Sequence, residues 1–384
     1  MTNTLTNLIP DLYSSLDVVS RELTGFIPVV TLDAQASRAA VGQQVRSFVA
    51  PASTASDITP NNVVPDDGDQ VIGNKSVVIQ KSRGVRVRYN GEEELGLANG
   101  GPGASAIRQN QFAQAMRTLT NEIEADLAGL HVGASRAYGT AGTTPFGTAG
   151  DYTDASNALK ILKDNGAPLS DNQLVMNTTA GANMLGKQAS VDQSGTDSIL
   201  RQGILLDVNG VAIRESGQVI TSTAGTGSSA TTNAAGYSVG DTVITLASAG
   251  TGTILAGDII TFAGDANQYV VEAGDADVSG GGTITLAAPG LQVAIAGSAT
   301  AITVVAAAAR NMVFNRSAIV LAQRAPALPE GGDMADDRVS VVDPRSGINF
   351  EVAVYKQYRQ VSYEVSAAWG VKLIKPEHTA LLLG

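Results

Sequence analysis

Apolar residues recur at helical spacing in two stretches of this sequence, residues 11–24 and 104–137. The longer covers residues 104–137, where apolar positions repeat every three or four residues, which predicts one helix of ~34 residues and ~50 Å. Such a helix is too long for a small globule to cover, so we expect a sheet or a neighbouring subunit to bury its stripe. Shorter helices are predicted over residues 11–24, 154–164 and 180–188, the last capped by Thr178 or Thr179. The stripe of the long helix consists of Phe112, Met116, Leu119, Ile123, Leu127 and Leu130.

Short extended runs predict strands on both sides of that helix. Residues 42–97 contain three such runs, separated by prolines and an acidic turn, and predict a long two-stranded excursion with a mobile tip. Residues 348–354 and 361–369 keep a period of two, which predicts antiparallel strands near the C-terminus. The three runs of the excursion are residues 45–49, 77–80 and 85–89.

The sharpest change in composition lies at residues 215–309, which contain seven acids and neither Lys nor Arg. This segment consists of short strands divided by Gly-Asp turns, a pattern typical of a small antiparallel sandwich or barrel. We therefore expect a separate β-domain inserted into the chain. Its predicted strands are residues 242–247, 259–262, 269–272 and 283–287, and its turns follow Gly240, Gly257, Gly264 and Gly274.

Composition argues against several classes of chemistry. The 384 residues include no Cys and only two His, which excludes disulfides, thiolate zinc sites and cysteine nucleophiles and leaves little for Ser/His/Asp catalysis. His131 is predicted to be a structural residue beside the long stripe. These features favour a protein without enzymatic activity and without a cofactor.

The charge balance and the apolar segments bear on partners and location. A net charge of −11 argues against a chain that coats nucleic acid, although not against one that encloses it. The first residues lack the basic and apolar regions of a secretory signal, so a non-exported chain is expected. Residues 291–309 carry no charge, but Gly and Thr interrupt them, and we interpret them as buried β structure and not as a membrane helix.

Three spans imitate ligand-binding motifs. Residues 181–187 fit the phosphate-cradling pattern G-x-x-x-x-G-K, but Gln188 lacks the hydroxyl that holds Mg²⁺, so a plain strand-cap-helix unit is favoured. Residues 101–106 resemble a G-x-G-x-x-A dinucleotide turn without the βαβ context. Asp275 and Asp277 could supply oxygen ligands to Ca²⁺, but no EF-hand loop surrounds them, and a polar turn is favoured.

One charge cluster favours a functional role. Lys75 and the bases that follow it precede three consecutive acids, and in a strand Arg86 and Arg88 share one face while Val85 and Val87 take the other. A solvated strand face and an intersubunit contact are both open interpretations, and nucleic-acid contact is a weaker third because no aromatic residues interleave. The candidate intersubunit residues are Lys81, Arg83, Arg86, Arg88, Glu92, Glu93 and Glu94.

In order along the chain, these pieces are an N-terminal arm, a long two-stranded loop, a spine helix, a mixed domain and an inserted β-domain. In that order the chain resembles the major capsid (coat) proteins of tailed bacteriophages with the HK97 fold, and within them the P22-like coat group with its inserted β-domain. The segments that carry the resemblance are residues 78–95, 158–168, 174–177, 200–203, 210–216, 311–318 and 363–376.

The resemblance implies an α+β, HK97-like capsid fold and a structural function. The chain would assemble in the host cytoplasm into hexamers and pentamers of an icosahedral virion shell around double-stranded DNA, without sequence-specific binding and without a membrane. Scaffolding and portal proteins would be partners, and a cement or decoration protein is left open. The implied division is an N-terminal arm at 1–41, the extended loop and a P-domain strand at 42–98, the spine region at 99–150, the first part of the A domain at 151–220, the inserted β-domain at 221–305 and the returning A- and P-domain strands at 306–384.

Two other functional classes compete with this interpretation. A β-rich bacterial or phage surface protein of adhesin type would explain the Gly-Asp turns and the absence of Cys, but it predicts an export signal and does not explain the spine helix. A nucleotide-dependent enzyme would rest on Lys187 and needs the missing Ser or Thr.

Overall fold

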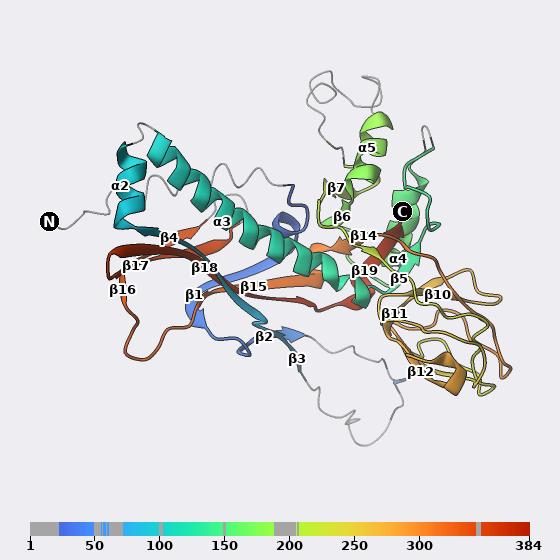
Figure 1. The fold of residues 1–384 in the computed structure, drawn as a ribbon. Helices are drawn as coiled ribbons and strands as arrows, with labels where there is room; N and C mark the ends of the chain where they lie inside the picture. Colours follow the sequence, from blue (N-terminus) through green and yellow to red (C-terminus); the bar gives the residue numbers. More distant parts are fainter. Residues whose placement is uncertain are drawn as a thin grey trace.

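The computed structural model describes residues 23–49, 55, 57–58, 60, 72–99, 103–148, 151–187, 205, 207–342 and 347–384. These residues form two larger β-sheets and a two-stranded hairpin, with helices on the sheet faces (Figure 1). The helix predicted at 11–24, except its last two residues, lies outside the described part, and so does most of the predicted tip of the excursion. The expected mixture of helices and antiparallel strands is confirmed, and the fold is α+β.

The first sheet is organised around its longest strand, β18 (Gln360–Leu373). Strand β4 runs antiparallel along one edge of β18, from the Asn90–Gln360 pair to the Lys81–Trp369 pair. The other edge is shared, because β17 pairs with residues 360–366 and β15 with residues 368–373. The sheet therefore forks along β18. The remaining strands are β1 (Thr31–Ala39), β4 (Lys81–Asn90), β15 (Ile319–Pro326), β16 (Ala335–Val342) and β17 (Asn349–Gln357).

Helix α3 (Gly103–Ala128) lies across the face formed by β4 and β18 (Figure 1). The Phe112 ring meets the Tyr363 ring of β18 edge to face, with centroids 5.5 Å apart and an interplanar angle of 84°. Each fully buried apolar side chain contributes about 1.5–3 kcal/mol, so this stripe is the main attachment of the helix. The sheet is thus the cover that the long stripe requires. The stripe residues buried there are Phe112, Met116, Leu119, Ile123 and Leu127.

The prediction of one helix over 104–137 is wrong at its C-terminal end. The helix ends at Ala128 and continues as a 3₁₀ turn over Gly129–Gly133. Two glycines in five residues weaken α-helix propensity there. The chain then extends as β5 (Arg136–Tyr138), because its backbone pairs with strands on both sides.

A two-stranded hairpin projects from the first sheet. Strands β2 (Gln44–Val49) and β3 (Gly73–Val78) pair in antiparallel register, as the first two extended runs predict, while the third run belongs to β4. The hairpin base is anchored by Val77 and Ile79, which pack on the β15–β18 region. A Cβ at Gly370 would lie 1.9 Å from the Val78 carbonyl oxygen. Only glycine allows the hairpin to cross β18 at this distance.

The second sheet has helices on one face and the α3 cluster on the other. Its order is β13 (Ile302–Val304), β10 (Ile259–Phe262), β11 (Gln268–Ala273), β5, β19, β14, β6 and β7. In β14, Met312 and Phe314 join the core beneath α3, while Val313 joins a second core with α4 and α5. The strands and helices introduced here are α4 (Thr153–Asp164), β6 (Asn172–Met176), α5 (Thr178–Lys187), β7 (Val211–Glu215), β14 (Ala308–Asn315) and β19 (Thr379–Leu383).

Helices α4 and α5 agree with the predicted positions, with one difference at a cap. The predicted caps Thr178 and Thr179 are already inside α5. The Asn177 carboxamide oxygen instead accepts the Ala180 N–H at 2.9 Å. Asparagine is an equally good N-cap, and its own N–H donates to Asn311 Oδ1 at 2.8 Å, so α5 is attached to β14 through this residue.

The segment without Lys or Arg, residues 215–309, leaves the second sheet and returns to it at one place. Strand β8 (Thr221–Ser222) pairs with Ala308 and Ala309 at the start of β14, so the ends of the intervening residues lie side by side. Between them, antiparallel strands enclose a separate apolar cluster, and β11 joins this group to β5. All four predicted strands are present. The strands are β9 (Val243–Leu246), β10 (Ile259–Phe262), β11 (Gln268–Ala273), β12 (Gly282–Leu286) and β13 (Ile302–Val304).

Asp258 shows how a Gly-Asp turn of this segment is fastened. Its carboxylate accepts the Leu255 N–H at 2.6 Å and the Gly225 N–H at 3.0 Å, so it closes its own turn and binds a neighbouring stretch.

Over the described ranges, no helix is long and apolar enough to cross a membrane.

One carboxylate joins three parts of the fold. Glu124 of α3 is completely buried and accepts the N–H groups of Gly25, Phe26 and Ile27 at 2.6–3.1 Å. It also accepts the Ser216 hydroxyl at 2.8 Å, just after β7. Burial raises the pKa of Glu124, and the four donated hydrogen bonds act in the opposite direction. The spine helix is thereby fixed to the N-terminal segment and to the second sheet.

We expect Glu124→Gln to lower the free energy of unfolding by about 2–4 kcal/mol, because one amide oxygen cannot accept all four bonds and the amide nitrogen would face donors. Urea unfolding followed by circular dichroism measures this. Glu122→Gln on the same helix is the matched control, since Glu122 Oε2 lies 3.6 Å from Arg83 Nε and the Arg83 side chain is largely exposed, so this pair contributes about 0–1 kcal/mol. Equal urea midpoints for the two variants would contradict the assigned role of Glu124.

Burial shifts the pKa of both imidazoles in the same direction. His131 lies in the turn after α3 and is buried, with Nδ1 3.2 Å from the Ala128 carbonyl oxygen. Burial lowers the pKa of His131, and the positive charge of Arg310 lowers it further. Burial also lowers the pKa of His378. Both side chains are therefore neutral in the folded chain at pH 7.

Because the folded pKa of each histidine lies below the unfolded value near 6.5, the unfolded chain binds protons more readily as the pH falls. The neutral imidazoles make their full contribution to the free energy of unfolding above the unfolded pKa. As the pH falls below it, that contribution decreases by at most about 1.4 kcal/mol per pH unit for each group. We expect His131→Gln to lose less stability than the parent between pH 7.5 and 5.5 in parallel urea titrations. The pKa values of Glu124 and Glu215 are raised, so these two groups make the folded chain more stable as the pH falls, in the parent and in the variant alike. The difference between the pH dependences of the two proteins therefore reports on His131.

Candidate subunit-contact surface

Strand β4 presents two faces with different neighbours. Val85, Val87 and Tyr89 face α3 and its core, and Arg86 and Arg88 lie on the opposite face, as the alternation predicts. Lys81 and Arg83 share the α3 side. The strand therefore divides the predicted basic cluster into two pairs with different neighbours.

Most of these bases have partners within the chain. Lys81 Nζ lies 2.7 Å from Asp126 Oδ1, and Asp126 also accepts the Trp369 indole N–H. Arg86 Nε lies 2.7 Å from Glu364 Oε2, directly across the β4–β18 pairing. Arg88 stands opposite Ser362, is exposed, and makes no ion pair among the described residues. Lys75 donates to the Ile374 carbonyl oxygen.

The three acids begin a helix that the sequence analysis missed. In α2 (Gly91–Asn99) the Asn90 side chain accepts the Glu93 N–H at 2.8 Å, and the Glu93 carboxylate accepts the Asn90 N–H at 2.9 Å. This reciprocal pair is a capping box, and the spacing Asn90-x-x-Glu93 is the signal that would have found it. Glu93 is thus occupied in capping, and Glu94 lies 3.8 Å from Arg108, while Glu92 makes no ion pair in the part of the chain described here.

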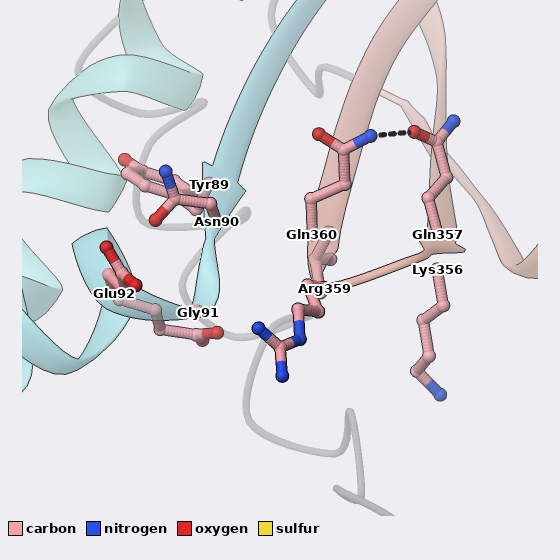
Figure 2. Close-up of a pocket in the computed structure, with 10 residues that line it drawn as sticks. Tyr89, Asn90, Gly91, Glu92, Lys356, Gln357, Arg359 and Gln360 are labelled. Atoms are coloured by element: carbon pink, nitrogen blue, oxygen red, sulfur yellow. Dashed lines mark hydrogen bonds between the residues drawn. The ribbon is translucent and has the colours of Figure 1, made fainter.

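A groove of about 630 Å³ separates these acids from a basic turn. Figure 2 shows Asn90 and Glu92 on one wall and Gln357, Arg359 and Gln360 on the other, with the Arg359 guanidinium directed into the space between. Within the described ranges, no ion pair crosses the groove. One wall therefore offers free carboxylate and the other free guanidinium.

The basic wall is the turn between β17 and β18, and the sequence analysis did not single it out. Tyr358 at its tip is 89% exposed, and the Arg359 guanidinium lies 5.8 Å from the centre of the Tyr358 ring. Arg359 has a φ of 56°, the left-handed region that a tight two-residue turn requires. The sequence signal that would have indicated this turn is the short polar stretch between two segments whose apolar residues alternate with a period of two. Lys356 also lines the groove, but it is paired with Asp336 at 3.1 Å.

The motif that imitates a phosphate loop is structural. Lys187 is buried, and its Nζ donates to the Thr148 and Asp151 carbonyl oxygens and lies 5.1 Å from the centre of the Tyr152 ring. A Cβ on Gly181 would overlap the Glu215 carboxylate, so a larger residue here would require the Glu215 side chain to move. This lysine stabilises the segment before α4 and has no free ammonium for a nucleotide.

The other two motifs have no ligand geometry either. Asp277 accepts the Ser279 N–H and caps a 3₁₀ turn, and Asp275 accepts the Asp277 N–H at 2.8 Å, which is the expected polar turn. Residues 101 and 102 of the dinucleotide-like turn lie outside the described residues, and 103–106 begin α3. Among the residues described, no group of three His, Asp or Glu side chains is placed to hold a metal ion.

Comparison with known proteins gives similarity in three dimensions only. No protein-family model matches the sequence, and no curated protein matches it. A capsid structure of the cyanophage P-SCSP1u is 13% identical, with a TM-score of 0.47, and the match covers 94% of this chain and 88% of that one. A virus-like particle from Pyrococcus furiosus is 11% identical, with a TM-score of 0.46 and coverage of 98% and 99%. A structure from Mycobacterium phage Che8 is 13% identical, with a TM-score of 0.45 and coverage of 89% and 84%. At TM-scores below 0.5, these likenesses carry no argument about function.

The two outer arginines of β4 should differ in their effect on stability. We expect Arg86→Glu to destabilise the unassembled chain by about 0.5–1 kcal/mol, because it places two carboxylates opposite each other at Glu364. Arg88→Glu faces Ser362 and should stay within about 0.5 kcal/mol of the parent. Urea midpoints test both, and an equal loss in the two variants would contradict the assigned pairing.

Proposed function

We propose that this chain is the structural subunit of a closed shell, the major capsid protein of a tailed double-stranded DNA bacteriophage with an HK97-like fold. The observation that carries the proposal is the order and packing of the elements. A projecting hairpin, a helix laid along a long sheet, a mixed second sheet and a β-segment that leaves and returns at one place follow one another as the sequence resemblance implies.

In this proposal the parts have separate tasks. The hairpin within residues 42–98 would extend over an adjacent subunit, α3 would run beneath the shell surface, and the second-sheet region from 151 to 220 would gather near the axes of hexamers and pentamers. Residues 221–305 would be the inserted domain of the P22-like group. Scaffolding and portal proteins would be partners in assembly, and the shell would enclose DNA without reading its sequence.

The groove supplies a physical route to association. Glu92 and Arg359 line the groove and are not paired with each other among the described residues, so each can meet an opposite charge on a neighbouring copy. Arg359 of one copy would meet Glu92 of the next. Such charge pairs set register and suppress wrong pairings more than they add affinity. The proposed role is non-enzymatic, which is supported by the structural use of Lys187.

Light scattering with negative-stain imaging tests the class of protein. The chain is expressed alone and together with the genes that flank its own, and closed shells or ring-shaped capsomers are the expected result. A strictly monomeric chain in both preparations, over a range of salt and protein concentrations, would overturn the proposal and favour the adhesin-type surface protein.

Charge reversal across the groove tests the proposed contact. We expect Arg359→Glu and Glu92→Lys each to raise the protein concentration needed for assembly at least tenfold, which corresponds to about 1.4 kcal/mol. The double variant should regain part of that loss because the two signs are exchanged together. Arg359→Lys keeps the charge and is the matched control.

Circular dichroism of each unassembled variant shows whether the fold is retained. Normal assembly of both single reversals would remove the groove from the contact without affecting the capsid proposal itself.

A further inference from the structure

A second concavity, lined by arginines, lies at the base of the hairpin. Its volume is about 330 Å³, and residues from the end of β1 and the start of β2 line it. The hairpin leaves the first sheet at this place (Figure 1). That volume is roughly ten times the ~30 Å³ that one water occupies in the liquid. Its lining residues are Ser37, Arg38, Ala39, Gln43, Gln44, Val45, Arg46, Ile79 and Arg324.

The lining contains three guanidinium groups and no carboxylate. Arg324 is 4% exposed and donates to the Asp33 and Gln323 carbonyl oxygens, both at 2.6 Å, and to Asp33 Oδ1 at 3.2 Å. Arg38 donates to the Pro326 carbonyl oxygen at 2.8 Å and to both oxygens of Glu351. A guanidinium has five N–H donors, so each of these two still has donors to offer.

Their carboxylate partners fix these arginines in place. Glu351 is buried and is held in turn by Arg338, at 2.9 Å. Arg38 and Arg324 are thus positioned before any ligand arrives, and little side-chain freedom remains to be lost on binding. The fixed pair supplies geometry, but most of its charge is neutralised.

Arg46 supplies the free charge. It is exposed on β2 and makes no ion pair among the residues that the structure describes. Gln43 uses its carbonyl oxygen to accept the Ala40 N–H at 3.1 Å, which leaves its NH₂ group as a donor beside the pocket. An array of N–H donors with one unbalanced positive charge suits an oxyanion and repels a cation.

We propose that this pocket binds a phosphate group. In the shell of the proposed function, on which this source depends, the phosphate belongs to the backbone of the enclosed nucleic acid, and the alternative source of the same chemistry is free phosphate. The chain carries a net charge of −11, so contact with a polyanion is confined to such local sites and is strongly weakened by salt.

The test uses the full chain in its unassembled form and two probes. A fluorescein-labelled DNA duplex of about 20 base pairs is titrated by anisotropy at low and moderate salt, and inorganic phosphate is added as a competitor. We expect Arg46→Ala to weaken duplex binding at least fivefold. Arg214→Ala, which removes an exposed arginine of β7 far along the second sheet from the hairpin, is the matched control and should bind as the parent does.

Each outcome decides one point. Duplex binding that phosphate competes away and that depends on Arg46 supports the pocket with nucleic acid as the source. A rise in thermal midpoint with inorganic phosphate that Arg46→Ala removes, without duplex binding, supports the pocket with free phosphate as the source. No effect of either probe, or equal losses in the Arg46 and Arg214 variants, overturns it. Arg46→Ala should still form shells, so failure of this site and failure of the capsid proposal are separate results.

Discussion

The buried carboxylate of Glu124 is the constraint on which the arrangement of the fold depends. Its four hydrogen bonds reach across 92 to 99 residues of sequence, to the backbone at Gly25–Ile27 and to Ser216. An ionised group in this position is tolerated only when all of its donors are present, because burial opposes the charge. The spine helix, the N-terminal segment and the end of β7 must therefore reach their places together. Apolar packing gives α3 its cover, and Glu124 specifies where along the sheet the helix lies.

The sequence predicted those elements whose pattern is set by local burial. The stripe from Phe112 to Leu127 separates a buried from an exposed helix face and so predicts the helix directly. Around Tyr363 the apolar residues at every second position predict the strand, although most of β18 is buried on both faces. The end of α3 was missed because strand pairing at Arg136 overrides the helical pattern. Helix α2 was missed because its evidence is a capping pair and not a periodicity. The ion-pair partners of the charged residues could not be predicted from the sequence. Glu364, for example, faces Arg86 only because their strands pair, and the two residues are 278 positions apart.

The distribution of charge follows from the same pairings. The bases of β4 are mostly balanced by α3 and β18, which leaves Arg88 outside, and Arg359 and Glu92 remain on opposite walls of one groove. The segment at 215–309 has seven acids and no base of its own, and several of these carboxylates accept N–H groups of their own turns. In that segment, acidic residues serve as turn formers as well as charges. A negative overall charge thus coexists with a few positive side chains that have no ion-pair partner among the described residues.

The fork along β18 has a mechanical consequence. Strand β4 is paired with β18 over ten consecutive positions, whereas β17 and β15 each hold only a part of the opposite edge. Tension directed along β4 loads this whole ladder in shear, so its hydrogen bonds resist together. A force that separates the two branches of the fork acts on the shorter ladders and opens them one bond after another. The sheet is therefore stiff along β4 and compliant across the fork, which gives the chain a preferred direction in which to bend.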